Sequence, residues 1–472
     1  MTYLGDPFSL ALCGGGFRAT LFHLGVVRAL KENGALKTDL IRQVSAVSGG
    51  SILAAHLSLN WEAYTASDAA FDRATQEIID FVRSDVRGTV IRKWVLGCAT
   101  YFPRFAGEEQ SRWSLGNLLQ KQYSRLYNDA KMGSLEGTNR PKVKFHCTSL
   151  TTGSPCYFDQ EGFTWESKQD NPDAEPVPLA DLPIAFAVAA SSDFPPLFPP
   201  IEVTNKTLSC DADQFPHTHR LTDGGVYDNL GIDIFIEDKK FRERLIIISD
   251  AEGNFDSDFP AKYAYPVTRN VRASDLLMKR VSALRLDDLS AISPAHVRIK
   301  IRTENNNRKN VRLSPEAQRA LINVRTDLDT FSDLEIAALI THGFNTARQT
   351  LVDEKLIDAS APYASWDPLG NLNKLSDQTT SSKLQESRER AWRLWANNDP
   401  VSWATAIYAF IVIAILAAPT AFLAWRSATE AQKAAAAQRA AAVAQMNAIF
   451  ADARYAEASA LLTSGLGGAS SA

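Results

Sequence analysis

Ser48 stands where a buried strand is expected to turn sharply into a helix. Residues 43–47 are typical of a short apolar strand, and residues 52–57 of an apolar helix. Two glycines follow the serine, and small residues allow the tight backbone turn that exposes a nucleophilic hydroxyl at a helix N-terminus. The pattern G-x-S-x-G is met with Ala46 in its first place. A strand-to-helix turn without catalytic function would have a similar sequence, so this motif indicates a nucleophile only together with further motifs.

A glycine-rich turn upstream offers a second piece of chemistry. Residues 8–13 are expected to form a strand, a helix with an apolar stripe comes after the turn, and between them lie Gly14, Gly15 and Gly16. Three glycines leave backbone N–H groups bare at the positive end of a helix, which makes an anion site. The anion is either a phosphate or the oxyanion of a tetrahedral intermediate.

A nucleotide phosphate is the weaker of these two alternatives. The run Gly14-x-Gly16-x-x-Ala19 formally fits the dinucleotide fingerprint. That fingerprint also requires an acidic residue about 20 residues further on, at the end of the second strand. Here the second strand ends at Ser48, and Asp39 lies before it. The positions therefore favour the oxyanion.

An Asp-Gly-Gly sequence that begins at Asp223 is the third motif, and it offers a carboxylate on a backbone that can approach another loop closely. The three motifs, in this order, resemble the patatin-like phospholipases, relatives of the cytosolic phospholipase A group. Segments 145–153, 187–200 and 325–335 resemble further blocks of that family. The resemblance covers about residues 5–350.

The resemblance implies a three-layer α/β/α fold with a largely parallel central sheet, and a Ser–Asp dyad that needs neither cofactor nor metal. Ser48 would attack the ester carbonyl, and Asp223 would accept its proton and return it to the leaving alcohol. The backbone N–H groups of Gly14, Gly15 and Gly16 would stabilise the oxyanion, each typically by about 3 kcal/mol. Burial in an apolar cleft would raise the pKa of the aspartate and improve it as a base.

Three further residues have competing interpretations. Arg18 either contacts the phosphate of a substrate or makes a structural ion pair. His23 and His56 lie in the helices that follow the two motifs, so a Ser–His–Asp triad is the competing mechanism. In α/β-hydrolases the oxyanion loop follows the third strand, ahead of the serine, whereas here the serine follows one strand and one helix. The element order therefore disfavours the triad.

The composition limits the possible classes of protein and the cellular compartments in which it could act. The chain has 472 residues and a net charge of −4, which gives no nucleic-acid footprint. Its 5 cysteines show no metal-ligand spacing and suit a reducing compartment. The N-terminus has neither a basic region nor a long apolar run, so we expect no secretory signal and a cytoplasmic catalytic domain.

The chain divides into four expected parts. Strands alternate with helices up to residue 350, which predicts an α/β catalytic domain. The parts are the catalytic domain 1–350, a linker and juxtamembrane helix 351–399, a transmembrane helix 400–426 and an Ala-rich helical tail 427–472. The tail allows either self-association or a plain solvated helix.

The transmembrane expectation rests on an uncharged run from Trp403 to Trp425. A helix of this length spans about 34 Å, enough for the hydrocarbon core. Tryptophans at both ends are typical of an interfacial belt, and basic residues on both sides leave the positive-inside rule undecided. A buried helix is the alternative. We expect a single pass in the cytoplasmic (inner) membrane, with the catalytic domain inside.

Together these observations predict a membrane-anchored serine lipid hydrolase that cleaves phospholipid or lysophospholipid esters. The alternative from another class is a catalytically minor patatin fold that serves as a membrane sensor or assembly module. A third hypothesis combines both, as an enzyme held inactive until a signal assembles it into a membrane-degrading effector.

Overall fold

The computed structural model describes residues 4–466 except for eleven short stretches, namely 102–113, 166–174, 196–197, 239–240, 242–243, 254–265, 294, 305–312, 359–365, 371–376 and 388–399. The chain forms two compact units, Met1–Ala396 and Asn397–Ala472.

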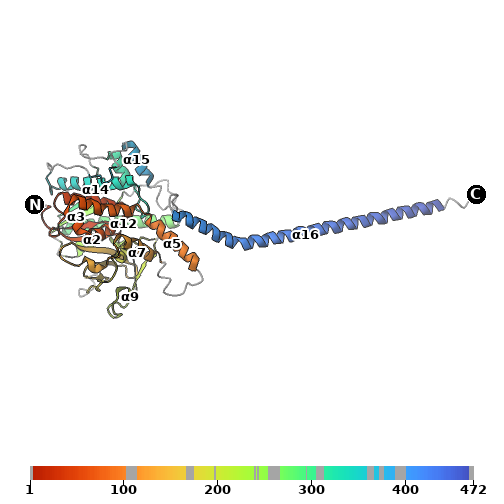
Figure 1. The fold of residues 1–472 in the computed structure, drawn as a ribbon, viewed down its shortest axis with the longest axis horizontal. Coiled ribbons are helices and arrows are strands. Elements are labelled where there is room, and N and C mark those ends of the chain that lie inside the picture. Colours follow the sequence, from red (N-terminus) through yellow and green to blue (C-terminus); the bar gives the residue numbers. More distant parts are fainter. Residues whose placement is uncertain are drawn as a thin grey trace, which may run out of the picture. The chain divides into compact units, whose positions relative to one another are not determined.

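The first unit is built on one largely parallel sheet (Figure 1). Its order is β5-β4-β3-β2-β1-β8-β9. Five neighbouring strands are parallel, namely β1 (Phe8–Leu12), β2 (Ile41–Val47), β3 (Lys142–Ser149), β8 (Leu245–Asp250) and β9 (His296–Lys300). The four antiparallel strands are β4 (Pro155–Phe158), β5 (Phe163–Thr164), β6 (Ile201–Val203) and β7 (His219–Asp223). The expected α/β sheet is confirmed.

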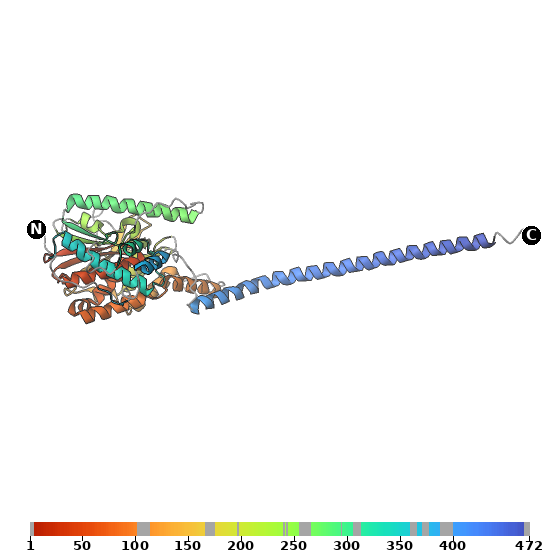
Figure 2. The same ribbon diagram turned by 90° about the horizontal axis from the view of Figure 1, so that it is seen from above.

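Helices cover the sheet on both sides. Figure 2 shows α12 (Pro266–Ile292, green) along one side of this unit and the orange helices α3 (Trp61–Ala66), α4 (Asp68–Val82) and α5 (Val86–Tyr101) along the other. The expected three layers are therefore present. The remaining helices that concern the site are α1 (Gly16–Glu32), α2 (Gly49–Leu59), α7 (Leu115–Leu126), α8 (Ile184–Ser192), α10 (Gly225–Asp228), α11 (Asp233–Glu237) and α14 (Asp333–Asp353).

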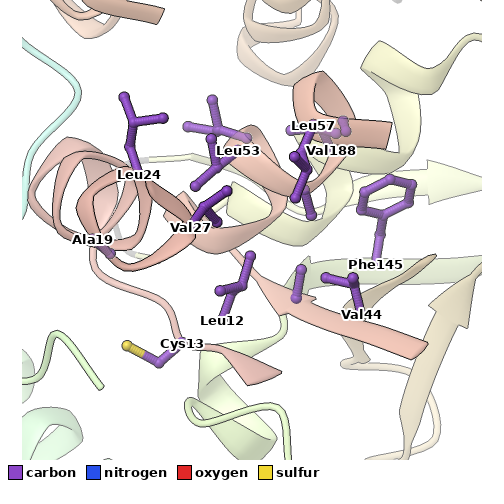
Figure 3. Close-up of a cluster of buried hydrophobic side chains, with 14 of the residues drawn as sticks. Leu12, Cys13, Ala19, Leu24, Val27, Val44, Leu53, Leu57, Phe145 and Val188 are labelled. Carbon is purple, nitrogen blue, oxygen red and sulfur yellow. The ribbon is translucent and has the colours of Figure 1, made fainter. Parts of the chain in front are cut away.

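An apolar core fixes the two loops that carry the motifs. Side chains from three strands and three helices meet in it, and Figure 3 labels among them Leu12, Leu24, Val27, Val44, Leu53, Leu57, Phe145 and Val188. None of these is more than 1% exposed. Because α1 and α2 pack against each other and follow the paired strands β1 and β2, the Gly-rich turn and the serine turn are held side by side at the carboxyl ends of these strands.

Part of the segment 351–399 packs on the first unit. The Trp366 carbonyl accepts a hydrogen bond from Thr341 on α14 (2.7 Å), and the Trp366 ring contacts Phe71 of α4 edge to face. Helix α15 (Asp377–Gln385) lies against α13 (Pro315–Ile322). The expected juxtamembrane helix falls mostly on residues 388–399, outside the described part.

The second unit is a single helix, α16 (Pro400–Leu466, 67 residues), which includes Pro419. The expected helical state of 400–426 and of most of the Ala-rich tail is confirmed. The membrane-crossing part of the expectation is not shown, because among the described residues no helix combines the length and apolar character that a membrane span needs. Several side chains between positions 401 and 416 lie outside that description.

Candidate active site

Ser48 occupies a strained turn between β2 and α2. Its backbone has φ 51° and ψ −116°, a positive φ that a residue with a side chain rarely adopts. Close packing enforces this conformation, because a Cβ added at Gly49 would lie 2.1 Å from the Gly16 carbonyl oxygen. A Cβ at Gly50 would lie 2.3 Å from the Leu12 oxygen. Strain of this kind clusters at active sites.

The register of β3 brings Asp223 to this turn. Strand β2 runs along one edge of β3, with Val47 opposite His146, while β4 occupies the other edge. Strand β7 runs antiparallel to β3 and ends with Asp223 opposite Cys147, the next position along. The two strands therefore meet end to end beside β3, and the serine that follows β2 faces the aspartate that ends β7.

The Asp223 carboxyl is buried, and burial raises its pKa to about 7. The Ser48 hydroxyl and the Gly225 N–H, which donates to Oδ1 over 2.7 Å, lower the pKa and offset part of this rise. Ser48 and Asp223 do not reach full hydrogen-bond geometry, and catalytic hydrogen bonds often tighten only in the substrate complex. A carboxyl that ionises near pH 7 is matched to proton transfer under neutral conditions.

The Gly-rich turn differs from the expectation at one of its three glycines. The Gly14 N–H donates to the Asn229 carbonyl oxygen (2.9 Å), so it is not free to bind an oxyanion, and its expected role is wrong. Gly15 and Gly16 adopt φ values of 135° and 55°. In the described part of the chain their N–H groups have no acceptor, and neither has that of Gly49, the residue after the serine. These three groups can serve as oxyanion donors.

The Arg18 side chain supports the Gly-rich turn from inside the fold and is unavailable to a substrate. Its guanidinium donates to the carbonyl oxygens of Ile322 (3.1 Å), Val324 (2.8 Å) and Ala251 (2.9 Å). The side chain is buried, which lowers its pKa to about 10. The expected phosphate contact is therefore wrong, because the donors of this cation are already used inside the fold. The structural alternative holds, with carbonyl groups in place of an ion-pair partner.

The loop after α13 completes this support. The Asp327 carbonyl oxygen accepts the Phe17 N–H (3.1 Å) at the start of α1. The loop is itself fixed by Arg325, a buried side chain that pairs with Asp329 (2.7 Å) and with Glu335. The segment that resembled a distant family block thus positions the Gly-rich turn.

The C-terminus of α8 contacts both halves of the site. Ser191 Oγ accepts the Ser48 N–H (3.1 Å) and pairs with Ser51 Oγ (2.8 Å). The Asp193 carbonyl oxygen accepts the Asp223 N–H (3.1 Å). Sequence reasoning gave these residues no role. Their only signal was a helix of small residues that ends directly before a Pro-rich loop.

No histidine contacts the serine. All seven lie in the described part of the chain, and the two considered for a triad are bonded elsewhere. His23 bonds Ser249 Oγ (2.6 Å), and His56 bonds Glu77 (2.9 Å). Burial lowers the pKa of His23 to about 4. Among the described residues, no cluster of His, Cys, Asp and Glu side chains could hold a metal ion.

Comparison with known proteins gives one family match and several structural likenesses. Residues 10–236 match the family model of the patatin-like phospholipases. A search of curated proteins finds no match. Among solved structures, human GIVD cytosolic phospholipase A2 is similar, with 12% identity over 79% of this chain and 61% of that chain and a TM-score of 0.49.

Two bacterial structures are also similar. VipD from Legionella pneumophila has 14% identity over 74% of this chain and 67% of that chain, with a TM-score of 0.30. The type III effector protein ExoU of Pseudomonas aeruginosa has 14% identity over 75% of this chain and 54% of that chain, with a TM-score of 0.27. The chain spans about three fifths of the length of the human structure.

Proposed function

Residues 10–236 are a patatin-like phospholipase domain, and from this premise we propose that the protein is a serine lipid acyl hydrolase with a Ser48–Asp223 dyad. Its substrates in this proposal are acyl esters of phospholipids or lysophospholipids. The observation that carries the proposal is the meeting of β2 and β7 beside β3, which places a strained serine opposite a buried aspartate.

The proposed reaction follows from this geometry. Ser48 Oγ bonds to the ester carbonyl carbon while its proton passes to the ionised Asp223. The negative charge then lies on the carbonyl oxygen, where the N–H groups of Gly15, Gly16 and Gly49 stabilise it. The intermediate collapses, the alcohol leaves with the proton from Asp223, and an acyl-serine remains. Water activated by the same aspartate releases the fatty acid.

The decisive experiment follows product release by the purified full-length protein on phospholipid and lysophospholipid dispersions. Wild type is compared with Ser48→Ala and with Ser84→Ala, an exposed serine outside the site. We expect fatty acid from wild type and Ser84→Ala only. A fluorophosphonate ester, which reacts with activated serines, should label the same two proteins. Undiminished release by Ser48→Ala would refute the dyad, and no release by wild type would favour the sensor or assembly alternative.

The cellular place of the enzyme is a separate proposal. Attachment to the cytoplasmic membrane, with the catalytic unit inside, rests on the uncharged run 403–425, and self-association rests on the Ala-rich tail. Fractionation of cells tests the first, because protein released by carbonate is not embedded in the bilayer. Sedimentation of the full chain, compared with a chain that ends at residue 396, tests the second.

A further inference from the structure

Helix α8 ends in a carboxyl group that is buried without a partner. Asp193 is its C-cap residue and is 0% exposed. Neither carboxyl oxygen has a hydrogen-bond partner among the described residues. An ionised carboxylate in such a place is very costly, so burial favours the protonated form. The negative end of the helix dipole acts in the same direction.

Asp193 is also next to the proposed base. Its carbonyl oxygen accepts the Asp223 N–H (3.1 Å) and the Thr222 hydroxyl (2.8 Å), so it is fixed to the end of β7. Two neighbouring carboxyls in one buried site do not both ionise readily, because each charge opposes the other. The site therefore holds an acid pair of which one member ionises first.

The order of ionisation follows from the surroundings of each carboxyl. Burial and the Asp223 charge raise the pKa of Asp193 to about 9; the Ile201 N–H lowers it slightly, although it does not reach hydrogen-bond geometry. Asp223 has two donors close by, the Ser48 hydroxyl and the Gly225 N–H, and its pKa is about 7. Between these values the pair shares one proton, which resides on Asp193.

Other titratable groups around Asp193 keep a constant charge over this range. The elements that pack on α8 are α2, α7, β3 and β7. Tyr123 of α7, which bonds Ser192 Oγ (2.9 Å), and Cys147 of β3 both have a pKa raised by burial. Helix α2 contacts α8 through Ser51, whose hydroxyl bonds Ser191 Oγ (2.8 Å), while its His56 bonds Tyr64 and Glu77. Near pH 7 Tyr123, Cys147 and His146 of β3, whose pKa burial lowers to about 3, keep a constant charge.

We infer that Asp193 is a positioning residue of the dyad: it stays protonated while Asp223 is ionised, and its own ionisation sets the alkaline limit of activity. The inference rests on the proposed dyad function. Loss of the Asp193 proton places a second negative charge in the buried site. Like-charge repulsion then opposes both the closed site and the developing oxyanion.

The pH dependence of kcat/KM on a dispersed ester tests this inference. Wild type should be half-maximal near pH 7, reach a plateau near pH 8 and fall about tenfold per pH unit above pH 9, as expected for one proton. Asp193→Asn and Asp193→Ala should keep the acid limb and lose the alkaline limb. Tyr123→Phe, the matched control, should keep both limbs. A wild-type profile without an alkaline limb overturns the inference whether or not the variants fold.

Two more outcomes would overturn the inference. Retention of the alkaline limb in both Asp193 variants is one. The second outcome is a downward shift of the acid limb by a full pH unit in the Asp193 variants. It would mean that Asp193, and not Asp223, is the ionised carboxyl of the pair in wild type.

Thermal stability gives a readout that does not depend on turnover. Asp193→Asn should raise Tm over wild type more at pH 8 than at pH 5, because only the unfolded wild type ionises this group freely. An equal change at both pH values contradicts a protonated Asp193. Since Ser48→Ala tests the dyad through activity alone, failure of the dyad and failure of the Asp193 inference give different results.

Discussion

Replacing Asp223 by asparagine should abolish activity and at the same time stabilise the fold. The amide keeps the shape of the carboxyl, and its oxygen can still accept the Gly225 N–H, but it cannot take a proton from Ser48. The side chain is only 2% exposed, so the charge is removed from a site with almost no solvent screening. Function and stability are thus opposed at this position.

The size of the gain follows from the pKa of Asp223. Its folded value, about 7, lies above the unfolded value of 3.8, so the folded state keeps the proton longer. The resulting cost of folding is absent below pH 3.8, grows as the pH rises and is full above pH 7. It amounts to about 1.7 kcal/mol at pH 5 and about 4 kcal/mol at pH 8. Loss of the charge also lowers the pKa of Asp193, which acts in the same direction.

Urea unfolding of wild type and Asp223→Asn, followed by circular dichroism at pH 5 and pH 8, measures this effect. The stability advantage of the variant should grow by about 2–3 kcal/mol between the two pH values. Any fixed cost of the substitution cancels in that comparison. Ser48→Ala serves as the control, since it removes activity and leaves the carboxyl in place. An advantage that is the same at both pH values would falsify the raised pKa.

Four further changes have defined outcomes. Ser48→Gly and Ser48→Ala should both be inactive, but the glycine variant should be about 1 kcal/mol more stable in urea unfolding, because glycine tolerates the positive φ; equal stability would argue against strain. Gly15→Val should lower kcat by about 10²-fold or more in a folded protein, since the valine disturbs an oxyanion donor; unchanged turnover would move that site elsewhere. Arg325→Gln should destabilise the first unit by about 3 kcal/mol, because two buried carboxylates lose their shared cation and keep only weaker partners, Arg87 for Asp329 and Ser332 for Glu335; a loss below about 1 kcal/mol would contradict a supporting role for the loop. Removal of 397–472 should leave turnover on dispersed esters within about twofold, as expected for compact units; loss of that activity would show that the units depend on each other.

The local patterns were sufficient for the main strands and for the positions of Ser48 and Asp223 at neighbouring strand ends. Strands at 245–249 and 297–301 are confirmed to within one residue at each end, and the strand at 143–147 to within two. The serine turn and the aspartate could be found because each motif is a short sequence whose glycines are needed for its own backbone. The backbone conformation of such a motif depends on the residues directly beside it in the sequence, so the sequence alone can reveal it.

The errors concern groups whose partners lie far away in the sequence. Gly14 was expected to donate to an oxyanion, but its N–H is used by the carbonyl of Asn229. For Arg18 the sequence left a substrate phosphate and a structural ion pair open, and the guanidinium instead donates to carbonyl groups beyond residue 250. Asp193 carries no motif at all, and its burial follows only from how α8 packs. No local pattern reports such contacts.

The uncharged run 403–425 shows a different limit. Its composition predicts a helix and a membrane span together, and α16 confirms the helix alone. The hydropathy of a segment indicates whether it can enter a lipid bilayer. The helical backbone of α16 gives no information about the medium that surrounds it. The environment of this helix therefore needs an experiment of its own.

The carbonyl groups that hold Arg18 have a consequence for protein synthesis. Arg18 and Val324 are 306 positions apart, so the Gly-rich turn lacks this support until that distant residue has been made. At translation rates of about 5–20 residues per second, the interval is about 15–60 s. Ser48, the glycine turns and Asp223 are all synthesised before it ends. The nascent chain therefore lacks this support for most of its synthesis, and the proposed site is first supported in full when the first unit is nearly complete.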